Sequence, residues 1–206
     1  ITNVFDIGNL QNEFLHIPTA YTVMENARRK KLGLGREDYA KQCGKLFEGL
    51  SKVSATHPNS MFPLNLQSAD IIKITESNNA ITDTYPRAMT AKDGVNQAAA
   101  VLMMSTEKAK ELGIDESLWI YAISGSEAED VTLPYREDLS QSVAMKAAYD
   151  GALSAAGLSS GDMSCFDIYS CFPVAVFAAC DALGIAYDDP RGLTVTGGLP
   201  FFGGPG

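Results

Sequence analysis

Three adjacent residues, Tyr169, Ser170 and Cys171, place a thiol and two hydroxyl groups in one short stretch of chain. The residues that follow predict a helix over 171–185 with Pro173 in its first turn, where proline is favoured. The positive end of a helix lowers the pKa of a thiol, so Cys171 is a plausible nucleophile. Tyr169 and Ser170 can donate hydrogen bonds to a substrate oxygen. A lone cysteine without a partnered histidine is more often a buried structural residue, and local chemistry favours that interpretation.

The glycine-rich segment TGGLPFFGGPG, residues 196–206, is the second candidate site. Its backbone N–H groups can cradle a thioester oxygen or a phosphate, or the glycines can simply turn the chain. The segment carries no acidic or basic side chain. Compact domains rarely finish inside such a loop, so we expect the protein to continue beyond it.

Both segments follow short apolar stretches that predict strands. Strands are predicted over 93–106, 117–124, 164–168 and 193–196. Helices are predicted over 106–114, 136–158 and 171–185, the last two ending at Gly157 and Gly184. This alternation predicts an α/β fold with a mostly parallel, buried sheet and flanking helices. Ligands of such sheets bind at the carboxyl ends of the strands, where both candidate segments lie.

The first third of the chain is predicted to be helical. Helices are expected over 18–34 and 35–58, and 69–75 is a short helix or strand. Amphipathic helices need a partner surface, so we expect residues 1–85 to form a helical excursion and not an independent core.

The composition excludes several classes of protein. The net charge is −9 and no dense basic block occurs, which disfavours nucleic-acid binding. No apolar run approaches the roughly 20 residues that cross a bilayer. The four cysteines form no CxxC pair, which favours reduced thiols and a cytoplasmic protein. With two histidines that are distant in sequence from the cysteines, we expect no metal site.

Three ordered motifs resemble the thiolase superfamily, in particular the sterol-carrier-protein type thiolases and their bacterial thiolase-like relatives. The run DGVNQAAAVLMMSTEKAKELGI, 93–114, is similar to the strand and helix that end the N-terminal half of a thiolase. YSCF at 169–172 stands where the family has Asn-Glu-Ala-Phe or His-Asp-Cys-Phe. GGLPFFGGPG at 197–206 stands where thiolases have a Gly-Gly…Gly-His-Pro loop. The resemblance covers nearly the whole chain.

The resemblance implies a partial thiolase-like fold, with this chain as an internal fragment of a longer protein. Residues 1–92 correspond to a helical excursion of the N-terminal half. Residues 93–115 correspond to the last strand and helix of that half, and 116–206 to a truncated C-terminal half.

The resemblance also implies roles for single residues. A catalytic set comprises Tyr169, Ser170 and Cys171, and the residues that bind substrate or coenzyme A are Phe172, Gly198, Gly203 and Gly204. Gly204 stands at the position of the catalytic histidine, and Tyr169 replaces the Asn or His that positions a catalytic water. The family's nucleophilic cysteine lies upstream of residue 1, so Cys171 is not a nucleophile by this correspondence.

The implied function is acyl transfer of the thiolase type, that is, Claisen condensation or thiolysis of acyl-CoA in lipid metabolism. A coenzyme A thioester is then the substrate, and no other cofactor is expected. An alternative is a non-catalytic acyl-CoA-binding or scaffold protein, which the glycine at 204 favours. A third is a subunit of a homo-oligomer, or of a complex whose partner chain carries the nucleophile.

Overall fold

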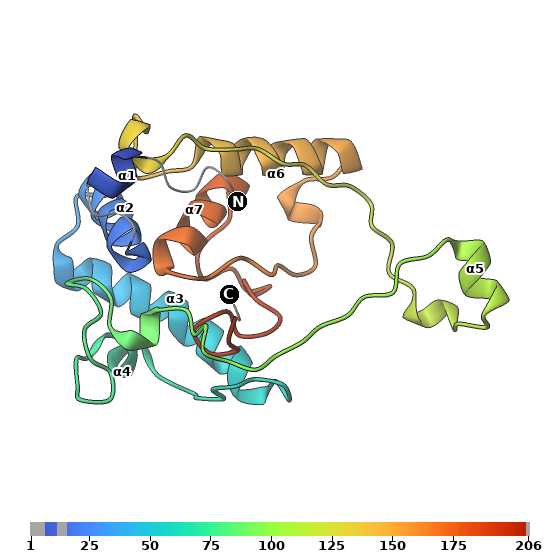
Figure 1. The fold of residues 1–206 in the computed structure, drawn as a ribbon, viewed down its shortest axis with the longest axis horizontal. Helices are drawn as coiled ribbons and strands as arrows, with labels where there is room; N and C mark the ends of the chain where they lie inside the picture. The colour runs from blue at the N-terminus through green and yellow to red at the C-terminus, as the bar shows by residue number, and fades with distance from the viewer. Residues whose placement is uncertain (1–6, 12–15, 205–206) are drawn as a thin grey trace.

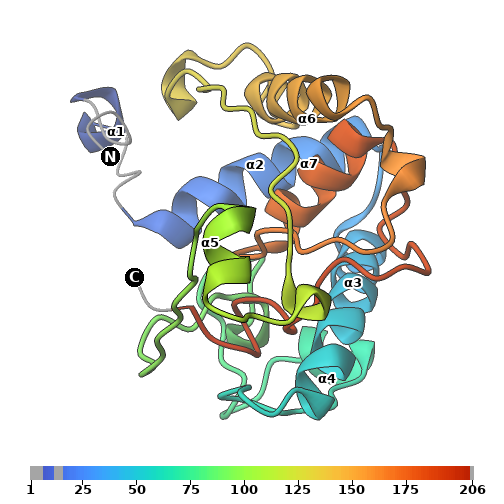
Figure 2. The ribbon, with the colours of Figure 1, turned by 90° about the vertical axis from the view of Figure 1, so that its right-hand side faces the viewer.

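The structure is a computed structural model of the 206-residue chain, and it describes residues 7–11 and 16–204. A helical body carries one long arm, which leaves the body, turns at its tip and returns (Figure 1). The body is built around α2 (Ile17–Lys31), α3 (Arg36–Thr56), α4 (Ser68–Ile72), α6 (Val143–Ala156) and α7 (Pro173–Leu183). The arm carries α5 (Thr106–Glu111) near its tip, which lies in front of the body when viewed from that side (Figure 2).

Several short elements complete the fold. They are α1 (Ile7–Gln11) and the 3-10 helices η1 (Arg87–Met89), η2 (Glu116–Leu118), η3 (Leu133–Tyr135) and η4 (Ser160–Asp162).

The long helices follow the sequence signals, but α6 begins at Val143, seven residues later than the predicted start at 136. α6 and α7 end at Gly157 and Gly184, whose φ angles of 69° and 67° are left-handed and therefore suit glycine. α7 begins at Pro173 with Phe172 as its N-cap residue. The prediction that Cys171 lies within the first turn is wrong, because an extended Phe172 separates the thiol from the helix.

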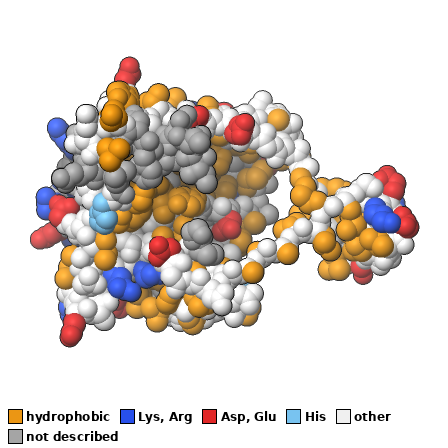
Figure 3. Space-filling view, viewed as in Figure 1, with side chains coloured by type: hydrophobic (Ala, Val, Ile, Leu, Met, Phe, Trp, Pro, Cys, Tyr) orange, Lys and Arg blue, Asp and Glu red, His pale blue; other side chains and the backbone are white. Residues whose placement is uncertain are grey.

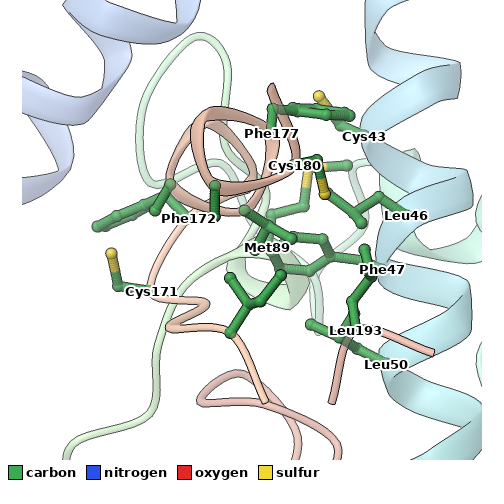
Figure 4. Packing of buried hydrophobic residues seen from close by; sticks show 14 of the residues in the cluster. Cys43, Leu46, Phe47, Leu50, Met89, Cys171, Phe172, Phe177, Cys180 and Leu193 are labelled. Carbon is green, nitrogen blue, oxygen red and sulfur yellow. The ribbon is translucent and has the colours of Figure 1, made fainter. Parts of the chain in front are cut away.

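The core lies between α3 and α7. The buried residues of α3 form one apolar stripe of Tyr39, Cys43, Leu46, Phe47 and Leu50. From α7, Phe177 points toward Cys43, and Cys180 points toward Leu46 (Figure 4). Each large apolar side chain buried in this way stabilises the fold by about 1.5–3 kcal/mol. Residues assigned to the N-terminal and C-terminal parts therefore share one core, while the domain boundaries at 92 and 115 stay predictions.

The predicted parallel sheet is not confirmed. Within 7–11 and 16–204 the β-pairing consists of a single antiparallel bridge between Ala80 and Pro86. The segments predicted as strands form no regular strand, and residues 117 and 118 lie in η2. One backbone hydrogen bond, from the Ile168 N–H to the Leu193 carbonyl at 3.0 Å, joins two of them. They form no ladder.

The burial predicted for the first two strands is wrong. Val101, Leu102 and Ile120 are 83%, 85% and 96% exposed. Hydrophobic side chains cover both the arm's tip and its stem (Figure 3). An apolar run gives a segment the tendency to form a strand, but burial also requires a neighbouring strand and a covering layer. The described residues supply neither along the arm.

Candidate active site

A cleft of about 860 Å³ brings the two candidate segments together. It is lined by Asn59, Met61, Asn96, Gln97, Ala98, Ala99, Asp167, Ile168, Tyr169, Ser170, Thr196, Gly198, Leu199, Phe202 and Gly203. Four predicted site residues are among these: Tyr169, Ser170, Gly198 and Gly203. Cys171, Phe172 and Gly204 do not line the cleft.

Ser170 joins the two walls of the cleft. The residue is 1% exposed, and its Oγ accepts a hydrogen bond from the Leu199 N–H at 3.0 Å. A Cβ atom on Gly198 would lie 2.4 Å from this Oγ and 2.8 Å from Leu50 Cδ2, and the φ of Gly198 is +73°. A side chain at Gly198 would therefore push the walls apart and strain the backbone.

The glycine-rich turn, residues 197–204, is held by backbone hydrogen bonds on two sides. The Met61 and Phe62 N–H groups donate to the carbonyls of Phe202 and Phe201 at 3.1 and 3.0 Å. On the other side the Gly204 N–H donates to the Lys92 carbonyl at 2.9 Å. The turn is thus fixed by backbone hydrogen bonds before any ligand arrives.

Gly203 is a buried residue that lines the cleft. Its φ is +102°, and within the described residues its N–H meets no hydrogen-bond acceptor. A buried backbone N–H without an acceptor costs free energy, so a ligand oxygen that accepted from it would be bound favourably.

Tyr169 contributes a hydroxyl donor. Partial burial of its phenol, and then the neighbouring Cys171, raise the pKa of Tyr169 to about 12, although the residue is 63% exposed. The phenol therefore stays protonated at neutral pH and can donate a hydrogen bond.

Cys171 has the environment of a structural thiol. It is 3% exposed, and burial raises its pKa. Hydrogen bonds with the Tyr21 and Tyr169 phenols lower the pKa but do not offset burial. The thiol is thus protonated at neutral pH, and protonated thiols are poor nucleophiles.

Phe172 and Gly204 lie next to the cleft in the chain but do not line it. The Phe172 ring lies between Tyr21 and Tyr85, with ring centroids 4.6 and 4.8 Å away. At Gly204 a Cβ atom would lie 2.3 Å from Leu199 Cδ2, so even an alanine requires the Leu199 side chain to move. Within the described residues, the position where the resemblance implies a histidine is Gly204, which has no acidic or basic side chain.

Sequence reasoning missed several cleft residues. Asp167 accepts from the Thr194 hydroxyl and the Val195 N–H at 3.1 and 3.2 Å, and it is the acidic residue of the cleft wall. The sequence signal that could have identified Asp167 is its place as the single acidic residue in the stretch CFDIYS, residues 165–170. Asn96 lies in the segment predicted as a strand over 93–106, and neither it nor Thr196 carries a signal of its own.

Among the described residues, no group of histidine, cysteine and acidic side chains could hold a metal ion. None of the helices described is both long and apolar enough to cross a membrane.

Comparison with known proteins gives the class. No family model matches the chain. The crystal structure of a monomeric SCP2-thiolase-like protein type 1 from Mycobacterium smegmatis matches with a TM-score of 0.91 and 44% identity, over 98% of this chain and 44% of that protein. The mitochondrial acetyl-CoA acetyltransferase A of Xenopus laevis is 32% identical over 124 residues, which are 60% of this chain and 26% of that protein.

The fold is therefore thiolase-like. The chain is similar to proteins of the thiolase superfamily, and it spans less than half the length of either protein it matches.

Proposed function

We propose that the cleft binds the thioester end of an acyl-CoA and contributes hydrogen-bond donors to acyl transfer of the thiolase type. One observation carries the proposal: Tyr169 and Ser170 meet Gly198 and Gly203 in a single cleft. The free Gly203 N–H would donate to the thioester oxygen, where negative charge develops when a thiolate attacks the carbonyl carbon. The oxyanion then re-forms the carbonyl, the bond to the coenzyme A sulfur breaks, and coenzyme A leaves as a thiolate that takes its proton from a general acid outside this sequence.

The cleft has no positive charge among its described lining residues, which favours binding of the uncharged thioester end of acyl-CoA over its phosphates. Within the described part of the chain no lysine or arginine lines the cleft, and Asp167 is its acidic residue. The phosphates of coenzyme A would find no counter-charge there, whereas a pantetheine thioester is neutral.

We expect these 206 residues alone to bind a thioester but not to catalyse its exchange. Thioester exchange needs a thiolate and a group that moves its proton, both within hydrogen-bond reach. Cys171 is a buried, protonated thiol, and Gly204 offers no side chain. Loss of general acid–base help alone costs about 10²–10⁴ in rate. The remaining catalytic groups would come from a polypeptide outside this sequence.

The test compares binding with reaction. Acetyl-CoA and S-acetyl-pantetheine should bind with similar affinity in calorimetry, and intact mass after incubation should show no acylation. Thiolysis of acetoacetyl-CoA that Cys171→Ala abolishes would make Cys171 the nucleophile and overturn this assignment. If neither thioester binds, the cleft is not a thioester site.

A further inference from the structure

Glu25 of α2 is the carboxyl group at the centre of the body. It is fully buried, and its two oxygens accept four hydrogen bonds. The Tyr39 hydroxyl and the Cys43 thiol donate to Oε1 at 2.5 and 3.9 Å. The Tyr85 hydroxyl and the Val174 N–H donate to Oε2 at 2.5 and 2.9 Å. Four donors from three different parts of the chain therefore converge on one side chain.

One of these donors belongs to the first turn of α7. Phe172, the N-cap residue, cannot accept a hydrogen bond with its side chain, and Pro173 has no N–H. Val174 thus carries the first N–H of the helix, and Glu25 receives it. A carboxylate at a helix N-terminus also interacts favourably with the helix dipole. Glu25 replaces the local cap that the sequence of α7 lacks.

The N-terminus of α7 is joined directly to the cleft. The chain runs from Tyr169 and Ser170 in the cleft wall through Cys171 and Phe172 into the helix. The Cys171 carbonyl accepts from the Ala91 N–H at 3.1 Å. Any shift at the start of α7 would therefore move the wall that carries the Ser170 Oγ.

Glu25 also supports the segment 169–172 indirectly, through Tyr85. Tyr85 donates its hydroxyl to Glu25 and packs its ring on Phe172, with the ring centroids 4.8 Å apart. Glu25 thus holds both the backbone of the helix start and the ring that clamps the N-cap residue.

We propose that Glu25 is a positioning residue of the cleft, which fixes the segment 169–172 against the glycine-rich turn by capping α7 from α2. The inference rests on the proposed function for its binding readout. Its structural readouts, amide exchange and thiol alkylation, do not depend on any ligand.

The primary test measures hydrogen exchange at two amides under native conditions. Glu25→Ala should speed exchange of the Val174 amide, which loses its acceptor, and of the Leu199 amide, whose acceptor Ser170 would shift. A buried amide that loses its hydrogen-bond acceptor should exchange about 10- to 100-fold faster. Alkylation of Cys171 by iodoacetamide, followed by peptide mass spectrometry, should speed in parallel, because the segment that buries the thiol loosens.

Conservative variants separate positioning from general destabilisation. Glu25→Gln keeps the size and one acceptor oxygen, so it should recover part of the Val174 protection and of the acetyl-CoA affinity lost in Glu25→Ala. Tyr85→Phe removes one donor and leaves the carboxyl group, so its effect should be smaller and in the same direction. This variant also keeps the test available if Glu25→Ala does not fold.

Glu48 provides a matched control. Its Oε2 accepts from the Ser68 N–H at the start of α4, which is the same kind of contact away from the cleft. Glu48→Gln should leave exchange at Val174 and Leu199 unchanged. The proposal is overturned if Glu25→Ala changes both amides less than twofold, or if Glu48→Gln changes them as much. Failure of wild type to bind acetyl-CoA, with these exchange effects present, would reject the proposed function and retain the positioning role.

Discussion

At the scale of single residues, Glu25 shows how burial and hydrogen bonding oppose each other. Removing the carboxyl group from water raises its pKa, while the hydrogen bonds from Tyr39, Tyr85 and Val174 and the charge of Arg28 lower it. Burial is the larger effect, so the pKa of Glu25 lies above its usual range. The protonated form is therefore favoured in the folded state relative to the unfolded state.

A pH dependence of stability follows. Because the folded pKa is raised, the stabilising contribution is complete below the unfolded pKa, near 4.5, and is lost as the pH rises through the folded pKa. The free energy of unfolding of wild type should therefore fall relative to that of Glu25→Gln as the pH rises above about 4.5, by about 1.4 kcal/mol for each unit of pKa shift. Urea denaturation of both proteins from pH 4.5 to 8 measures this difference. Parallel curves would show that burial does not dominate.

At the scale of elements, the glycine-rich turn packs closely against the segment that precedes α7. Gly198→Ala places a methyl group 2.4 Å from Ser170 Oγ in a left-handed backbone, and it should destabilise the fold by about 2–4 kcal/mol. It should also abolish thioester binding, since it separates the walls of the cleft.

The control for this variant is Gly94→Ala, whose new methyl group meets no atom within 4 Å. Its stability should stay within about 0.5 kcal/mol of wild type. Thermal unfolding followed by circular dichroism, together with calorimetry of acetyl-CoA binding, tests both variants. Full binding by Gly198→Ala would mean that the ligand does not need the observed contact between the walls.

Local signals were enough to predict the four long helices, α2, α3, α6 and α7. The apolar stripe of α3 repeats at helical spacing, and Gly157 and Gly184 end α6 and α7 because each needs a left-handed φ. The resemblance implied that Tyr169 and Gly203 belong to one site, and the fold places both in one cleft. The capping of α7 by Glu25 could not be predicted, because it joins residues 149 positions apart with no local pattern.

At the scale of the whole molecule, the arm is the least supported part of the chain. Its described residues from 98 to 104 and from 120 to 128 donate no backbone hydrogen bonds, and α5 is six residues long. The sequence of the arm has the apolar pattern of strands, but it does not reveal which residues would cover those strands. Segments with few buried contacts open at low free-energy cost.

Limited trypsinolysis should therefore cut first at Lys108 and Lys110 in the arm. Lys41 and Lys45 of α3 are similarly exposed, but they lie on a helix whose other face is packed in the core. Mass spectrometry of the first fragments distinguishes the two regions. Early cleavage within α3 would contradict the view that α3 and α7 form the stable centre.

The packing of α3 against α7 also sets the order in which the chain can fold. Leu50 ends the apolar stripe of α3, yet Leu193, which lies near it, and the α7 residues of the same buried cluster are synthesised only after the whole arm (Figure 4). At about 5–20 residues per second, a nascent chain would wait on the order of ten seconds with that stripe covered only by segments made before the arm, such as α4. Contacts between residues so distant in sequence also slow folding after release, since loop closure must precede them. During synthesis, the early helices would therefore be natural clients for a chaperone at the ribosome.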